Sequence, residues 1–134
     1  MTADFLPQSS ASSILMVDGD IISRHAIADY LRHCGYVVVE AADITEAYCA
    51  LNETSLSIDV ILFDAVTLGS QHGFELAAWI RNKQPKLEVK LVGGFETAAH
   101  TAAELCQSGP HLKKPYESDL VVEYIKRLRA SRLP

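Results

Sequence analysis

Long apolar runs, an excess of basic residues and paired cysteine motifs are all missing from this 134-residue chain. No apolar run reaches the ~20 residues of a membrane-spanning helix, so we expect no membrane partner. The net charge is −5, and nucleic acid is excluded as a main partner because contact with phosphates needs a basic face. The one basic cluster is interpreted as a solvated helix end and comprises Lys126, Arg127, Arg129 and Arg132.

Cysteine is scarce: the chain has Cys34, Cys49 and Cys106 and no CxxC pair. The odd number and wide spacing argue against a disulfide framework or a zinc site and indicate a reducing compartment, the cytoplasm. Residues 1–12 have neither a basic leader nor an apolar run typical of a signal peptide. Their Ser-rich composition predicts a disordered N-terminal arm.

What the sequence does contain is a regular alternation of apolar runs and helical patterns. Apolar runs typical of buried parallel strands occupy residues 14–17, 36–39, 59–63, 89–92 and 111–114. Helical spacing follows at residues 21–33, from 43, at 73–84, at 97–107 and from 117 or 118 nearly to the end. Asp43, with Glu46 three residues later, is typical of a capping box.

Five successive strand–helix units predict an α/β fold, because such units pack as a parallel sheet with helices on both faces. The expected architecture is a doubly wound five-stranded sheet of order 2-1-3-4-5. With no repeat or linker, residues 13–134 form one predicted domain, and we expect no attached output domain.

Charged residues and glycines gather where the predicted strands end. In strand order they are Asp18 and Asp20, Asp64, Gly93 and Gly94, and Lys114. The functional crevice of such sheets lies beyond the carboxyl ends of the strands, so three carboxylates and a lysine should converge there. Mg²⁺, which prefers oxygen ligands, would relieve the repulsion between the carboxylates. A carboxylate beside two cations is equipped to accept a phosphoryl group.

Each of these residues also has a purely structural interpretation. Asp20 is equally well explained as the N-cap of the first helix. An acid directly after a buried apolar run is unusual for a loop, so function is favoured for Asp18 and Asp64. Alternation along the last strand places Lys114 on the same face as Leu112, which favours function for it too.

The motifs ILMVDGD, GYVVVEAAD, DVILFD, GFELAAWIR, LVGGF and KKPY occur in this order between residues 14 and 116, within a pattern that covers nearly everything from residue 14 to 128. In this they resemble the receiver domains of response regulators in two-component signalling. The resemblance implies that Asp64 is the phosphoacceptor and that Lys114 contacts the phosphoryl group. It further implies that Gly93 and Gly94 form the loop at the phosphoryl group. The metal ligands implied are Asp18, Asp64, Asp20 and the backbone carbonyl of Val66.

Three of the departures from the family pattern bear on the site. Gly19 replaces the second acid of the pair, which predicts weak Mg²⁺ binding. Gly93 replaces a hydroxyl residue that normally contacts the phosphoryl group. This predicts that phosphorylation is weakly coupled to the rest of the domain. Thr67-Leu68 replaces Met-Pro, in a loop that is one residue longer.

The function expected from the resemblance is that of a stand-alone receiver phosphorylated by a histidine kinase or histidine phosphotransfer protein. It would signal by contact with an unknown downstream protein, with a homodimer left open, and catalyse at most its own phosphorylation and dephosphorylation. One alternative is a degenerate receiver that binds partners without phosphorylation. Remoter alternatives are a haloacid-dehalogenase-like phosphatase with Asp18 as nucleophile and a flavin-binding flavodoxin relative.

Overall fold

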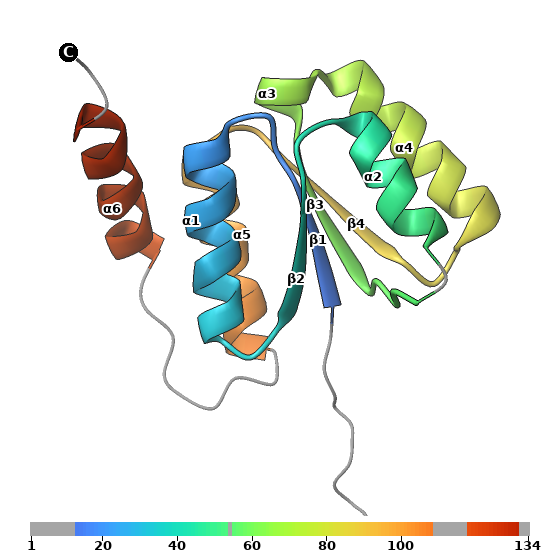
Figure 1. Cartoon of the computed structure of the whole chain (residues 1–134), viewed down its shortest axis with the longest axis horizontal. Coiled ribbons are helices and arrows are strands. Elements are labelled where there is room, and N and C mark those ends of the chain that lie inside the picture. Colours follow the sequence, from blue (N-terminus) through green and yellow to red (C-terminus); the bar gives the residue numbers. More distant parts are fainter. Residues whose placement is uncertain (1–12, 54, 109–117, 132–134) are drawn as a thin grey trace, which may run out of the picture.

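Four parallel strands form the centre of the molecule (Figure 1). The computed structural model describes residues 13–53, 55–108 and 118–131. Its strands pair in the order β2-β1-β3-β4 and are β1 (Ser13–Val17), β2 (Val37–Ala41), β3 (Val60–Asp64) and β4 (Glu88–Val92). This confirms the α/β class and the predicted order of the first four strands. The predicted fifth strand, residues 111–114, and the predicted arm, residues 1–12, lie outside the described residues.

Helices cover both faces of the sheet (Figure 1). The described helices are α1 (Ile21–His33), α2 (Ile44–Asn52), α3 (Ala65–Leu68), α4 (Ser70–Lys83), α5 (Phe95–Ser108) and α6 (Ser118–Ser131). One core cluster joins α1, α5 and α6 to the sheet through Ile14, Met16 and Leu62. The other core cluster joins α2 and α4 to the opposite face of the sheet through Leu15 and Val17 of β1. Alternate residues of β1 therefore serve opposite faces, which explains its continuous apolar sequence.

Local capping signals explain where α2 begins. The Asp43 carboxylate accepts a hydrogen bond from the Glu46 amide at 2.9 Å, and the Glu46 carboxylate accepts one from the Ala42 amide at 2.7 Å. The predicted capping box is thus confirmed in its essentials. The segment after β3 differs from expectation, because the one-turn helix α3 was not predicted and α4 begins at Ser70, three residues before the predicted start.

Cys34 and Cys106 form a disulfide, so the expectation of unpaired cysteines was wrong for these two. Cys34 caps the C-terminus of α1 and Cys106 lies in α5, and packing of these helices brings their Cα atoms to 5.5 Å. The two residues are 72 positions apart in the chain, so sequence spacing carried no sign of this contact. Cys49 is free and exposed. The pairing removes the cysteine-based argument for a reducing compartment.

None of the described helices is both long enough and apolar enough to cross a membrane.

Candidate functional site

Two buried carboxylates stand side by side at the carboxyl ends of neighbouring strands. Asp18 follows β1 and Asp64 ends β3, and the residues before them, Val17 and Phe63, are paired across the sheet. Asp18 is 0% exposed and Asp64 is 1% exposed. The structure therefore brings together the two acids that the sequence predicted to meet.

The Asp18 carboxylate is only partly satisfied. Its Oδ1 accepts hydrogen bonds from the Asp20 amide at 2.9 Å and from the Thr67 hydroxyl at 3.0 Å. Its Oδ2 is buried and has no hydrogen-bond partner in the described part of the chain. Burial, reinforced by the negative charge of Asp64 and opposed by these two hydrogen bonds, raises the pKa of Asp18 from 3.8 to about 6. A cation at Oδ2 would offset the unfavourable burial of the ionised carboxylate.

The main chain of Asp18 is held from two sides, which fixes its side chain. The Asp18 amide donates to the carbonyl of Ala41, the last residue of β2, at 3.1 Å. The Asp18 carbonyl accepts from Arg24 at 3.1 Å, and Arg24 in turn pairs with Glu40 at 3.1 Å. Helix α1 and strand β2 together thus position the acid.

Asp64 receives two backbone donors from different loops. Its Oδ1 accepts from the Val66 amide at 2.8 Å and from the Gly94 amide at 3.2 Å. These bonds make Asp64 the N-cap of α3 and link it to the loop after β4. The loop that the resemblance places at the phosphoryl group is thus bonded to Asp64 itself, through Gly94.

A hollow of about 490 Å³ opens above Asp64. It is lined by Asp20, Ser23, Asp64, Val66, Thr67, Gly93, Gly94, Phe95, Glu96, Thr97 and Arg129. Five of the predicted site residues are in this set. Asp18 lies beneath the surface, and Lys114 lies outside the described residues.

The loop after β4 keeps a hydroxyl, but four residues later than the family position. The Gly93 amide donates to the Thr97 hydroxyl at 2.9 Å, and that hydroxyl donates to the Gly94 carbonyl at 3.1 Å. Gly94 has φ +103°, which favours glycine, whereas a Cβ at Gly93 would meet only Val66, at 4.0 Å. Gly93 is therefore not required by the backbone, and Gly94 is.

Gly19 lies against the segment that follows β3. A Cβ added there would lie 3.3 Å from Leu68 Cδ2 and 3.4 Å from Thr67 Cβ. The Gly19 amide donates to the Thr67 hydroxyl at 2.9 Å. Thr67 thus packs where the missing acid would begin, a role that the sequence did not indicate.

Asp20 is engaged by three groups. It is the N-cap of α1, accepting from the Ile22 amide at 3.3 Å, and it also accepts from the Ser23 hydroxyl at 2.8 Å. Arg129, from the last turn of α6, forms an ion pair with it. The N-cap interpretation is confirmed. Arg129 lies in the last turn of α6 and is exposed, as the interpretation of the basic cluster expected, but its long-range contact with Asp20 left no trace in the sequence.

The donor set fits a divalent cation in part. Asp18 and Asp64 are adjacent oxygen ligands, and the unpartnered Oδ2 of Asp18 suits a hard cation. Across residues 13–53, 55–108 and 118–131, however, no three His, Cys, Asp or Glu side chains are grouped to hold a metal. Asp20, the third predicted ligand, is turned to Arg129.

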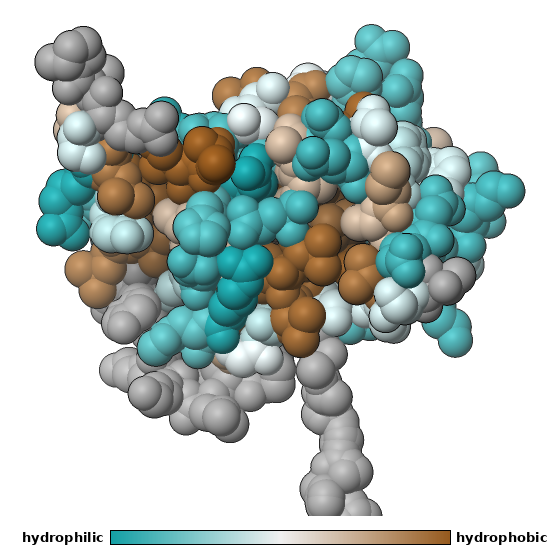
Figure 2. Space-filling view, in the orientation of Figure 1, coloured by the Kyte–Doolittle hydropathy of each residue, from teal (hydrophilic) through white to brown (hydrophobic). Residues whose placement is uncertain are grey.

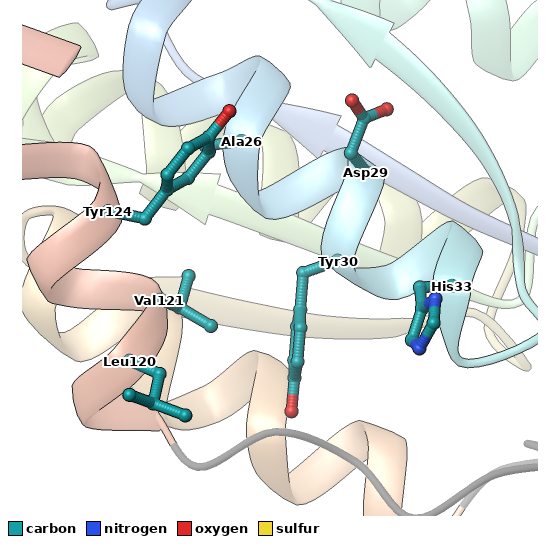
Figure 3. Close-up of a pocket in the computed structure, with 7 residues that line it drawn as sticks. All are labelled: Ala26, Asp29, Tyr30, His33, Leu120, Val121 and Tyr124. Carbon is teal, nitrogen blue, oxygen red and sulfur yellow. The ribbon is translucent and has the colours of Figure 1, made fainter.

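A second hollow, of about 340 Å³, lies between α1 and α6 and shares no lining residue with the first (Figure 3). Tyr30 and His33 of α1 line it from one side, and Leu120 and Tyr124 of α6 from the other. Leu120 and Tyr124 are exposed, and apolar surface gathers on the side of the molecule where α6 lies (Figure 2).

Comparison with known proteins shows which family the chain belongs to. The sequence profile of the response regulator receiver domain matches residues 14–126. The chain belongs to this family of signalling domains.

Individual relatives agree with this assignment. The chain is 30% identical to the regulatory protein VirG of Agrobacterium tumefaciens over 123 residues, 88% of this chain and 42% of VirG. It is 33% identical over 75 residues to the two-component response regulator-like protein PRR37 of Oryza sativa, 56% of this chain and 10% of that protein. The chain thus spans less than half the length of these relatives.

Solved structures show the same fold. A response regulator from Thermotoga maritima has a TM-score of 0.57 at 21% identity, covering 90% of this chain and 99% of its own. The chemotaxis response regulator CheY4 of Vibrio cholerae has a TM-score of 0.54 at 23% identity, covering 89% and 99%.

Proposed function

We propose that residues 13–134 form a single receiver domain that accepts a phosphoryl group on Asp64 from a histidine kinase or histidine phosphotransfer protein. The observation that carries this proposal is the buried pair of Asp18 and Asp64 beneath an open hollow, with Asp64 oriented by two backbone amides. The phosphorylated domain would signal by contact with a downstream protein, in the compartment of its kinase, which we propose is the cytoplasm. No reaction beyond its own phosphorylation and dephosphorylation is proposed.

The transfer step follows from the hydrogen bonds of Asp64. Its Oδ1 is held by the Val66 and Gly94 amides, which leaves Oδ2 as the attacking oxygen. Oδ2 forms a bond to the phosphorus of phosphohistidine, the P–N bond breaks, and the imidazole nitrogen keeps the electron pair. The Gly94 amide then donates to the product from the loop beside it, and Lys114 is the proposed second contact.

Mg²⁺ is the proposed cofactor and, when bound, would supply positive charge beside the phosphoryl oxygens. Asp18, Asp64 and the Val66 carbonyl are the proposed ligands, and Asp20 would join them after leaving Arg129. Because Gly19 contributes no acid, we expect weak binding.

A small phosphodonor such as acetyl phosphate tests this function, with and without Mg²⁺. Mass spectrometry should find one phosphoryl group, mapped to Asp64, absent in Asp64→Asn and kept in Asp119→Asn, which removes an exposed acid of α6. A label on Asp18 would favour the phosphatase mechanism, which its complete burial argues against.

A second candidate is a receiver that binds its partner without phosphorylation. The engagement of Asp20 by Arg129 and the crowding at Gly19 favour it, because both weaken the metal site. Absence of any Mg²⁺-dependent label, with phosphohistidine as well as acetyl phosphate as donor, would decide for this candidate.

A further inference from the structure

Arg129 connects α6 directly to the acceptor pocket. Its Nη2 donates to the Asp20 carboxylate and, at 2.8 Å, to the Ser23 hydroxyl. Its guanidinium lies over the Phe95 ring, 4.8 Å from the ring centre. All four residues line the hollow that contains Asp64.

This arrangement is more specific than a surface ion pair. The Arg129 side chain is 44% exposed, and a single pair at that exposure contributes little to stability. Here one planar guanidinium is positioned at once by a carboxylate, a hydroxyl and an aromatic face, from two other helices. Both hydrogen bonds start from Nη2, so within the described part of the chain Nε and Nη1 remain free to bind another acceptor.

We propose that Arg129 is a built-in cation of the acceptor pocket that binds Asp20 while Asp64 is unmodified and transfers to the phosphoryl group when Asp64 is phosphorylated. This inference rests on the function proposed above. It names a phosphoryl-binding residue on α6, at a position that the motifs of the resemblance do not include.

Charge decides the direction of the transfer. A phosphoryl group carries about −1.5 to −2 charges at pH 7 and offers three strong acceptor oxygens, whereas Asp20 offers a single negative charge. Guanidinium groups bind phosphate in paired hydrogen bonds, which suits the free donors of Arg129. A divalent cation at Asp18 and Asp64 would also compete for Asp20 and weaken its hold on Arg129.

The transfer gives α6 a way to report the state of Asp64. Arg129 lies in the last turn of α6, and Lys126 one turn earlier pairs with Glu96 at the rim of the same hollow, at 3.8 Å. A new partner for Arg129 would therefore shift the end of α6 relative to α1. This route needs no hydroxyl at Gly93, the position where the usual contact is missing.

The test uses beryllofluoride, which mimics the phosphoryl group on an aspartate, and compares wild type with Arg129→Gln and Arg129→Lys. Arg127→Gln is the matched control, because it removes the same charge from an exposed position of the same helix. Amide chemical shifts report residues 64–68, 93–97 and 118–131, and titrations give the affinities for Mg²⁺ alone and for beryllofluoride at saturating Mg²⁺.

In Arg129→Gln the affinities for beryllofluoride and for Mg²⁺ alone should change in opposite directions. Arg129→Gln should bind beryllofluoride roughly tenfold more weakly, as for loss of one hydrogen bond to a charged group, and lose the shifts in 118–131. It should bind Mg²⁺ alone more tightly, because Asp20 is released. Arg129→Lys should bind beryllofluoride with intermediate affinity, and Arg127→Gln should match wild type.

Two results would overturn the proposal separately from the function. Unchanged beryllofluoride affinity in Arg129→Gln would show that Arg129 does not contact the mimic, and weaker binding of both ligands would indicate general damage to the site. Absence of shifts at residues 64–68 and 93–97 in wild type would instead overturn the proposed acceptor function, and with it the role of Arg129.

Discussion

Replacing Asp18 by Asn should stabilise the metal-free protein at neutral and alkaline pH. The pKa of Asp18 is raised from 3.8 to about 6, chiefly by burial, so the folded state binds its proton more tightly than the unfolded state does. Above pH 6 the folded state must hold a buried carboxylate, and at about 1.4 kcal/mol per pKa unit this costs about 3 kcal/mol. Since the cost fades as the pH falls from 6 toward 3.8, the advantage of Asn should fade with it.

Asp18→Asn changes little besides the charge, because Asn keeps the acceptor Oδ1 and with it the hydrogen bonds from Asp20 and Thr67. The Asn amide buries two unpaired N–H donors at this place, whereas the protonated carboxyl of Asp18 buries one unpaired O–H donor. The variant should therefore be no more stable than wild type near pH 4. Urea unfolding in EDTA at pH 8, 6 and 4 measures the difference, with Asp119→Asn as an exposed control. Added Mg²⁺ should stabilise wild type more than the variant. A variant no more stable than wild type at pH 8 would refute this account of the site.

Three further predictions concern glycines and cysteines. The free energy of unfolding of Gly93→Thr should lie within about 0.5 kcal/mol of that of wild type, because the added Cβ has space. Gly94→Ala should lower the free energy of unfolding by about 1–2 kcal/mol, because Gly94 has a positive φ. Equal losses for the two variants in urea unfolding would contradict this interpretation of the loop. Gly19→Asp should improve Mg²⁺ affinity in calorimetry less than the double variant with Leu68→Ala, which removes the crowding side chain; identical affinities would show that crowding is irrelevant. Reduction of the Cys34–Cys106 disulfide, which closes a loop of 72 residues, should lower the free energy of unfolding by about 4 kcal/mol, measured in a Cys49→Ser background; no change on reduction would show that the bond is not formed in solution.

Local patterns predicted most of the fold because they depend on neighbours in the chain. The buried run of β1 and the Asp43–Glu46 cap are of this kind, and both were confirmed. The order of strands followed from general rules of chain connection. Asp18 and Asp64 were placed together for the same reason, since parallel strands end at one edge of the sheet.

What sequence reasoning missed depends on contacts between distant segments. Arg129 reaches Asp20 across 109 positions, and its helix-end setting gave no sign of this. Thr67 was noticed only as a departure from the family pattern, although its hydroxyl bonds both Gly19 and Asp18. Thr97 was not singled out, because a hydroxyl in the first turn of a helix is ordinary until its partners are known.

The fit between Gly19 and Thr67 bears on how such a receiver can change over time. An acid restored at position 19 would press against the Leu68 and Thr67 side chains, and the loop could shorten only with loss of the hydroxyl that holds Asp18. Either step taken alone therefore gives less than the two steps together. The two departures from the family pattern are therefore one linked change, and an engineer who wishes to reverse it must replace both segments together.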